Sequence, residues 1–509
     1  MRITKKQDRF PGILLTILLF IAEIVFILLL LSTNLISAKY IGLIFAVLII
    51  LLIIDHLLIK KFRKQIRFWI GIILMIIILA VLGLAGFYIH RTVSALDDIT
   101  GVNKEVAEIN VYVKQDNAAQ TLMDASEYSF GILAELDRAN TDAALQQMQT
   151  KTGIDASTKE YNSLTELADG LLKDDCQAIV LNRAYLDVLA QMDHYTTFSS
   201  QIRQINSEQV EILIERNTPA PTIAPAASVE QLVSDSSDKS SDNKVYTIYI
   251  SGIDTRGAMT SSSLSDVNII LTVNTETKQI LMISTPRDYY VPLSISNGVP
   301  DKLTHAGVYG VNVCMDTLDM LYDININYYF RLNFAGFIKI IDSLGGITVN
   351  SDYDFTSQNA SGFHFNQGEN HVNGEQALAF CRERYSFTEG DRQRGRNQMA
   401  VVQGVLDKVT SPELLKNYLS LLDSLSGCFE TNVPYDVITS LVKQQLDEGG
   451  SWQVLSYSTD GTGDTQKPYS MSQKAYVMVP DQTTVEKAKS LMEKVRQGFV
   501  LTDADITAQ

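Results

Sequence analysis

Five arginines lie close together in one short segment of the sequence, from Phe380 to Gln398. They alternate with other polar side chains and comprise Arg382, Arg384, Arg392, Arg394 and Arg396. A guanidinium group stays charged at any physiological pH, and its planar fork of donors matches phosphate or carboxylate with two parallel hydrogen bonds. The ordinary alternative is a solvated surface whose ion pairs carry little energetic weight. The density of positive charge in an otherwise acidic chain favours a site for a strongly anionic ligand.

Arg382 and Arg384 directly follow the apolar run Ala377–Phe380, which is typical of a buried element. On a β-strand, residues at positions i and i+2 project from the same face. We therefore expect Arg382 and Arg384 at the end of a buried element, with both guanidinium groups directed into one crevice. The same arginine-rich segment also offers Asp391 and Gln398.

Carboxylates occur at the ends of two neighbouring predicted strands. The runs Val245–Gly252, Val267–Asn274 and Gln279–Pro286 are short and apolar or β-branched, as in strands that are buried on both faces. Asp254 follows the first run and Asp266 opens the second. Two carboxylates at adjacent strand ends could share a Mg²⁺ ion, which takes oxygen ligands and adds water and substrate phosphates. Capping of the strand ends is an equally good interpretation of this spacing.

Further cations follow the third run. Arg287 comes directly after Pro286, and Lys302 and His305 precede a predicted helix. Loops at strand ends commonly carry the chemistry of α/β folds. Together with the arginine-rich segment, these residues describe a crevice with two acids for a metal and several permanent cations for a polyanion.

Helices are expected to alternate with these strands. Apolar spacing predicts them over residues 311–321, 334–343, 376–380 and 397–410. This alternation predicts an α/β fold, a three-layer α-β-α sandwich, for a catalytic domain that covers residues 245–500.

Three long apolar runs precede this domain, at residues 12–31, 40–59 and 68–88. Each is near the roughly 20 residues that a helix needs to cross a bilayer, so residues 1–92 are predicted to form three transmembrane helices. Basic residues before the first run and between the last two place the N-terminus in the cytoplasm. Everything after His90 is then extracellular, on a multi-pass protein of the cell membrane. Glu23 interrupts the first run, and either helix packing or a function would account for it.

Residues 96–215 are predicted to form a small extracellular accessory domain, mixed or mostly helical. Residues 110–116 resemble a strand, and apolar spacing is compatible with helices over 118–137, 142–150 and 181–192. A Pro/Ser-rich linker follows at residues 216–244, because its composition cannot recover the entropy of ordering through burial.

The whole chain is acidic, with a formal net charge of −16 over 509 residues. This balance argues against a nucleic-acid partner, because such partners are held chiefly by Lys and Arg. The four cysteines show no CxxC or CxxH spacing, so neither a zinc site nor a disulfide framework is indicated. A single disulfide between Cys314 and Cys428 is a hypothesis for an extracellular domain.

Several of these motifs occur together in the order of a known family. GIDTR, SDVNIILTVN, STPRD, DKLTHA and GEQALAFCRERYSFTEGDRQRGRNQ, spread over residues 245–410, resemble the LytR-CpsA-Psr family. The three predicted spans and the accessory domain resemble its capsule-associated branch. The resemblance implies a membrane-anchored, Mg²⁺-dependent phosphotransferase of Gram-positive bacteria. Such enzymes move a glycan polymer, such as capsular polysaccharide or teichoic acid, from a polyprenyl pyrophosphate carrier onto peptidoglycan.

The resemblance also implies roles for individual residues. Asp254 and Asp266 would hold Mg²⁺, and Asp391 would orient the attacking hydroxyl or the cations. The pyrophosphate would be held by Arg287, Lys302, Arg382, Arg384, Arg394 and Gln398, of which Arg382, Arg384 and Arg394, with Asp391, would be catalytic. One position departs from the family pattern, because Leu264 stands where an arginine is common. Either Arg256 substitutes for it or one phosphate contact is missing.

Two other functions fit the same residues. A polyprenyl-pyrophosphate pyrophosphatase would use the same metal and arginines with water as the nucleophile. A non-catalytic membrane-anchored protein that binds or regulates the cell wall would bind anionic lipid without turnover.

Overall fold

The computed structural model describes residues 10–33, 38–59, 65–99, 104–213, 245–253, 263–359, 362–411 and 428–507. The predicted linker at 216–244, the metal candidate Asp254 and the loop residue Arg256 lie outside these ranges. The chain folds as two compact units. The first comprises residues 1–101, 412–426 and 433–451, and the second comprises residues 102–411, 427–432 and 452–509.

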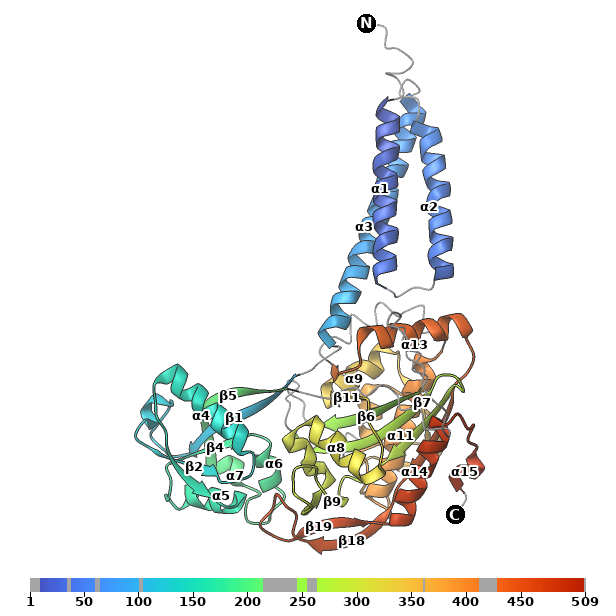
Figure 1. The fold of residues 1–509 in the computed structure, drawn as a ribbon. Helices are drawn as coiled ribbons and strands as arrows, with labels where there is room; N and C mark the ends of the chain where they lie inside the picture. Colours follow the sequence, from blue (N-terminus) through green and yellow to red (C-terminus); the bar gives the residue numbers. More distant parts are fainter. Residues whose placement is uncertain are drawn as a thin grey trace, which may run out of the picture. The chain divides into compact units, whose positions relative to one another are not determined.

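Three apolar helices dominate the first unit (Figure 1). They are α1 (Phe10–Ser32), α2 (Ala38–Ile59) and α3 (Gln65–Ile99). Each is long and apolar enough to cross a membrane. Most of their large side chains are exposed on the protein, as expected for surfaces that contact lipid. Glu23 and Asp55 are buried among the helices. The unit also contains α13 (Tyr435–Glu448).

The N-terminal part of the second unit is a mixed α/β structure with a five-stranded sheet, in the order β3-β2-β4-β1-β5. Its strands are β1 (Lys104–Lys114), β2 (Ser129–Leu133), β3 (Ser157–Tyr161), β4 (Ala178–Asn182) and β5 (Ile202–Leu213). Its helices are η1 (Met123–Ala125), α4 (Arg138–Thr152), α5 (Leu164–Leu172), α6 (Tyr185–Leu189) and α7 (Phe198–Gln201). We call this part, residues 104–213, the accessory part.

A six-stranded sheet forms the centre of the remainder, in the order β16-β11-β6-β7-β8-β17. Its strands are β6 (Val245–Ile253), β7 (Ser265–Asn274), β8 (Gln279–Ser284), β11 (Tyr328–Asn333), β16 (Phe429–Thr431) and β17 (Gln453–Ser458). β6 pairs with β11, and β8 with β17, in parallel, whereas β7 runs antiparallel to both of its neighbours. All six residues of β8 are buried, which confirms the prediction of strands covered on both faces.

Helices cover both faces of this sheet (Figure 1). On one face, a core around Tyr249, Ile270 and Ile283 packs against η2 (Leu303–Tyr309), α8 (Val311–Tyr322) and α14 (Gln482–Arg496). On the other, α9 (Phe334–Ser343) packs on β11, α11 (Asp391–Val409) on β7, β8 and β17, and α10 (Gly374–Arg382) between α9 and α11. The predicted three-layer α-β-α sandwich is confirmed.

Short elements complete the second unit. They are β9 (Tyr290–Pro292), β10 (Pro300–Lys302), β12 (Ile347–Ser351), β13 (Phe355–Thr356), β14 (His364–Phe365), β15 (Gly368–Val372), β18 (Gly461–Gln466), β19 (Ala475–Pro480) and α15 (Asp503–Thr507). All four cysteines are described and buried, and Cys314 and Cys428 do not form a disulfide. Cys314 lies on α8 and packs in the hydrophobic core.

The five-stranded and six-stranded sheets of the second unit are joined by buried contacts. Glu105 of β1 accepts a hydrogen bond from Arg331 of β11, and each side chain is only 3% exposed. Both carboxylate oxygens of Glu105 also accept from the N–H of Val311, at 3.1 and 3.0 Å, where α8 begins. Val308 and Met471 belong to the same hydrophobic core as α5 and α6 of the accessory part. These contacts join the accessory part to the six-stranded sheet.

Candidate active site

A cavity of about 160 Å³ opens where β7, β8 and β17 meet the start of α11. Its charged and amide lining residues are Asp266, Arg287, Asp391, Arg392, Arg394, Arg396, Gln398 and Asp460. Five of the predicted site residues, Asp266, Arg287, Asp391, Arg394 and Gln398, are therefore brought together. They come from three separate segments of the chain.

Arg287 and Asp266 form the centre of the site. Arg287 Nη1 donates to Asp266 Oδ1 at 2.8 Å, and the Thr304 hydroxyl donates to the same oxygen at 3.4 Å. Arg287 Nε lies 3.6 Å from Asp288 Oδ2. Burial acts to lower the pKa of Arg287, but Asp266, Asp288 and Asp391 outweigh burial and raise it. Arg287 is therefore permanently charged, and its partly buried side chain lines the cavity.

A second cation approaches from α11. Arg394 Nη2 lies 2.8 Å from Asp391 Oδ1, one turn earlier on the same helix. Burial lowers the pKa of Arg394, as do the nearby cations Arg287 and Arg384, while Asp391 acts in the opposite direction. An anion bound between these cations would relieve their mutual repulsion. The N-terminus of a long helix adds a further preference for negative charge.

α11 begins at Asp391, six residues before the predicted start at 397, so three of the five arginines lie on this helix. Arg392 donates to Asp460 Oδ1 at 2.6 Å and to the Gly461 carbonyl at 2.8 Å. Arg396 forms an ion pair with Glu389. Arg392 and Arg396 thus form ion pairs within the protein. For these two arginines the structure agrees with the alternative of a salt-bridged surface.

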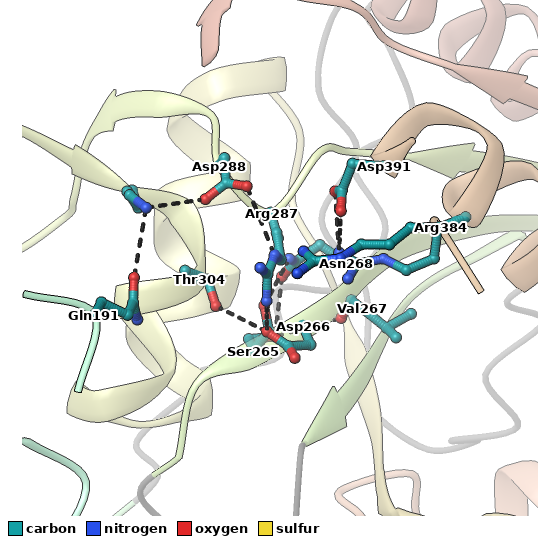
Figure 2. A network of polar contacts seen from close by, with 12 residues as sticks. Gln191, Ser265, Asp266, Val267, Asn268, Arg287, Asp288, Thr304, Arg384 and Asp391 are labelled. Carbon is teal, nitrogen blue, oxygen red and sulfur yellow. Dashed lines mark hydrogen bonds and ion pairs between the residues drawn. The ribbon is translucent and has the colours of Figure 1, made fainter. Parts of the chain in front are cut away.

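Arg382 and Arg384 lie at the end of a buried element, as predicted, but that element is the helix α10, so the strand rule that placed both side chains on one face does not apply. Arg382 is the last residue of α10, and its guanidinium lies 4.3 Å from the centre of the Phe334 ring. Neither Arg382 nor Arg384 lines the cavity. Arg384 Nη2 donates to Tyr385 Oη at 2.7 Å. Figure 2 shows Arg384 extending toward the group formed by Arg287 and Asp266, so the two arginines take different surroundings.

Lys302 does not line the cavity but is connected to it through Asp288, which neighbours the lining residue Arg287. Its ammonium group is 3.2 Å from Asp288 Oδ1 and donates to Gln191 Oε1 at 3.4 Å. Asp288 in turn neighbours Arg287, so the contacts run from the accessory part to the centre of the site. Figure 2 shows Gln191 at one end of this network and Asp391 at the other.

Magnesium was predicted at Asp254 and Asp266. Asp254 lies outside the described residues, and the described ones contain no group of three or more His, Cys, Asp or Glu side chains that could hold a metal. Mg²⁺ needs only one or two carboxylates when phosphates and water complete its shell. Asp266 lines the cavity, and its two hydrogen bonds to described residues both use Oδ1. Its Oδ2 therefore fits such an ion.

Leu264 stands at the position where the family pattern commonly has an arginine. Leu264 packs, half-buried, against the hydrophobic core of the accessory part. An arginine at this position would bring a charge to that apolar contact. Arg256, the suggested substitute, lies outside the described residues.

The sequence analysis did not identify three polar residues in or beside the site, namely Asp288, Asp460 and Gln191. Asp288 lies in the motif STPRD, and Asp460 follows strand β17, so the rule that strand ends carry chemistry could have found both. Gln191 carried no such signal. It lies more than 100 residues from Lys302, and only the packing of the accessory part brings them together.

One family match extends over the accessory part without following its fold. The family described as DNA polymerase processivity factor matches residues 44–181. That range begins within α2 and ends before β5, so it includes two apolar helices and omits a strand of the five-stranded sheet. It covers no complete unit of this chain.

The family described as LytR_cpsA_psr matches residues 212–494, which is more than half of the chain. The protein is 34% identical over 211 residues to the polyisoprenyl-teichoic acid–peptidoglycan teichoic acid transferase TagU of Bacillus cereus, covering 41% of this chain and 68% of that relative. For TagU of Enterococcus faecalis the values are 34% over 220 residues, 43% and 71%. The crystal structure of B. subtilis TagV is 26% identical in sequence, and the match covers 51% of this chain and 99% of the TagV chain, with a TM-score of 0.43. The chain belongs to the LytR-CpsA-Psr family.

Proposed function

We propose that this protein transfers a glycan polymer from a polyprenyl pyrophosphate carrier to a hydroxyl group of peptidoglycan. The observation that carries the proposal is the placement of Arg287, Arg394 and Asp266 on one cavity. Phosphoryl transfer depends on positioning and on neutralisation of phosphate charge, which Arg and a divalent cation supply. The printed names of the TagU relatives describe transfer of polyisoprenyl-linked teichoic acid to peptidoglycan. Teichoic acid and capsular polysaccharide are the polymer classes that we propose.

The step requires one new bond and one broken bond. The acceptor hydroxyl oxygen attacks the phosphorus that carries the glycan, and the bridging P–O bond breaks to release carrier monophosphate. The hydroxyl proton leaves to a base or to solvent. Arg287, Arg394 and Arg384 bind the phosphate oxygens, and Lys302 adds charge from behind Asp288. Asp391 orients Arg394 through its 2.8 Å ion pair, and Gln398 lines the cavity beside them.

A divalent cation would be held at Asp266, with Asp254 as its proposed second ligand. Bound Mg²⁺ would neutralise charge on the diphosphate oxygens. The residues of the chain do the remaining work. Arg287 and Thr304 hold the Asp266 carboxylate in place through Oδ1, so that its other oxygen is available to the ion.

Chelation of divalent cations is expected to lower the rate of transfer by about 100-fold or more, because a metal supplies several kcal/mol of charge stabilisation. Added Mg²⁺ should restore the rate. Asp266→Asn should lose most of this response, whereas Asp142→Asn, a matched change on an exposed carboxylate, should keep it. The measurement is product formation against free Mg²⁺. Full activity in excess chelator would disprove the magnesium requirement.

We place the cavity on the outer side of the membrane, because the basic residues near the first helix are expected in the cytoplasm. A polyprenyl pyrophosphate is confined to the bilayer. An enzyme that uses this substrate gains from an anchor, and α1, α2 and α3 supply helices of sufficient length.

The full-length protein in liposomes tests the proposal directly. The liposomes contain a polyprenyl-pyrophosphate-linked glycan, and peptidoglycan oligomers are added outside. The expected product is an oligomer that carries the glycan through a phosphodiester, with one carrier monophosphate released per transfer. Release of glycan phosphate at the same rate without acceptor would indicate a pyrophosphatase instead. Lipid binding with no release would indicate the non-catalytic alternative.

Arg384→Ala and Arg382→Ala are each expected to abolish transfer in this assay. Neither should change the free energy of unfolding by more than about 1 kcal/mol, because part-exposed charges seldom stabilise a fold by more. Arg138→Ala, at a part-exposed arginine of α4 with its own ion pairs, is the matched control and should leave transfer unchanged. Full activity of Arg382→Ala would show that Arg382 is not part of the site. This variant matters because the Arg382 guanidinium lies against the Phe334 ring in the free protein.

A further inference from the structure

Glu383, which separates Arg382 from Arg384, has a fully buried carboxylate. Its exposed fraction is 0%, although it lies at the end of α10 among cations. Within the described residues, every hydrogen bond that it accepts comes from a backbone N–H or from a hydroxyl group. The carboxylate therefore pairs with backbone N–H and hydroxyl donors and not with the adjacent guanidinium groups, whose positive charges can act on a ligand.

One carboxylate oxygen binds the segment that follows α10. Glu383 Oε1 accepts from the N–H groups of Arg384 at 3.0 Å, Tyr385 at 2.8 Å and Ser386 at 3.1 Å. Hydrogen bonds to an ionised acceptor are stronger than neutral ones. This oxygen thus fixes the backbone from which the Arg384 side chain extends.

The other oxygen binds a segment about 25 residues earlier in the chain. Glu383 Oε2 accepts from Ser357 Oγ at 2.9 Å, and from the N–H groups of Gln358 at 2.6 Å and Asn359 at 3.3 Å. Asn359 also donates from Nδ2 to the carbonyl of Arg382 at 2.9 Å. The backbone on both sides of Glu383 is therefore held against the same loop.

The charge state of Glu383 agrees with this geometry. Burial acts to raise the pKa of the Glu383 carboxyl, but the hydrogen bonds from Gln358, Ser357 and Ser386 outweigh burial and hold the pKa below its ordinary value. The carboxylate is ionised at neutral pH.

We propose that Glu383 is a positioning residue that fixes Arg382 and Arg384 for a diphosphate ligand. The proposal rests on the proposed function, which supplies that ligand. Long arginine side chains lose conformational freedom when they bind, and a backbone already ordered in the free protein avoids part of the cost of ordering. Glu383 supplies that order from inside the fold and does not contact the ligand itself.

The test measures binding of inorganic pyrophosphate to the full-length protein in detergent micelles by calorimetry, together with thermal unfolding and amide hydrogen exchange. Glu383→Gln keeps the size of the side chain but replaces one oxygen by an NH₂ group that faces backbone donors. Glu383→Asp keeps the charge and shortens the reach. Glu375→Gln is the matched control, because Glu375 is exposed in the first turn of the same helix.

Glu383→Gln is expected to weaken pyrophosphate binding by at least about tenfold, or 1.4 kcal/mol, and to raise hydrogen exchange at residues 357–359 and 384–386. Glu383→Asp should show an intermediate loss of pyrophosphate affinity while its unfolding temperature stays at the wild-type value. Glu375→Gln should show no loss of affinity. Wild-type affinity in both Glu383 variants would overturn the proposal. A loss that only parallels a lower unfolding temperature, with exchange raised throughout, would reduce Glu383 to a structural role and also overturn it. A wild-type protein that fails to bind pyrophosphate would instead count against the proposed function.

Discussion

Replacing Arg287 by alanine is expected to slow glycan transfer by about 10²- to 10³-fold, the loss typical for one preorganised donor to a developing charge. Arg287 combines three properties of such a donor. It is held by Asp266 at 2.8 Å, it lines the cavity, and its Nε atom is buried without a hydrogen-bond acceptor among the described residues. The measurement is the single-turnover rate of the reconstituted protein at saturating lipid-linked glycan.

Two further variants separate charge from geometry at this position. Arg287→Lys keeps the positive charge but loses the planar fork, so it should recover only part of the rate. Arg138→Ala, remote on α4, should transfer at the wild-type rate. The assignment of Arg287 fails if its alanine variant stays within about threefold of wild type, a difference below 1 kcal/mol.

Replacing Glu105 by alanine is expected to destabilise the second unit by about 3 kcal/mol, because the buried Arg331 loses its fully buried partner and keeps only the part-exposed Glu430, at 2.7 Å. Glu105 is the accessory part's contribution to a buried contact with Arg331. It also accepts the N–H of Val311 at the start of α8, which then loses its cap. Thermal unfolding of the full-length protein should show a lower midpoint for the second unit.

A double replacement tests whether this loss comes from the weaker pairing of Arg331, which would retain only Glu430. Glu105→Met combined with Arg331→Met exchanges the pair for apolar side chains of similar length, and is expected to recover much of the stability lost by Glu105→Ala. Glu160→Ala, which removes an exposed partner of Arg138, should shift the midpoint little. An unchanged midpoint in Glu105→Ala would show that the Glu105–Arg331 contact contributes little to the stability of the second unit.

The strands of the six-stranded sheet could be predicted because their sequences admit few alternatives. Continuous apolar or β-branched runs of six to ten residues form β6, β7 and β8. The predicted bounds of α9 also agree with the structure, since Asn333 at the N-cap accepts from the Gly336 N–H. Both results follow from local sequence.

The arginine-rich segment was harder, because its signals conflict. A capping box between Asn373 and Gln376 starts α10, and this motif was legible in the sequence. The helix predicted over 376–380 lies within α10, but the directions of Arg382 and Arg384 were inferred from the spacing rule for strands, which does not hold at a helix end. The helical start of α11 at Asp391 was hidden by a polar run without apolar periodicity, so internal partners of Arg392 and Arg396 could not be anticipated.

Non-local contacts were beyond reach of the sequence. Residues 118–137 have helix-compatible spacing, yet they contain η1 and strand β2, because pairing with β3 and β4 outweighs local preference. The 142–150 helix lies within α4, as predicted. The separation of Cys314 from Cys428 and the approach of Gln191 to Lys302 likewise depend on tertiary packing.

The order of the two compact units along the chain has a practical consequence for producing this protein. The first unit is not confined to the N-terminus, because it also takes residues 433–451, where Asp447 of α13 lies 2.7 Å from Lys39 of α2. A truncation that starts at residue 102 would keep α13 but remove Lys39, the partner of Asp447 in this ion pair. Purification in detergent with α1, α2 and α3 retained keeps all the segments of the first unit together.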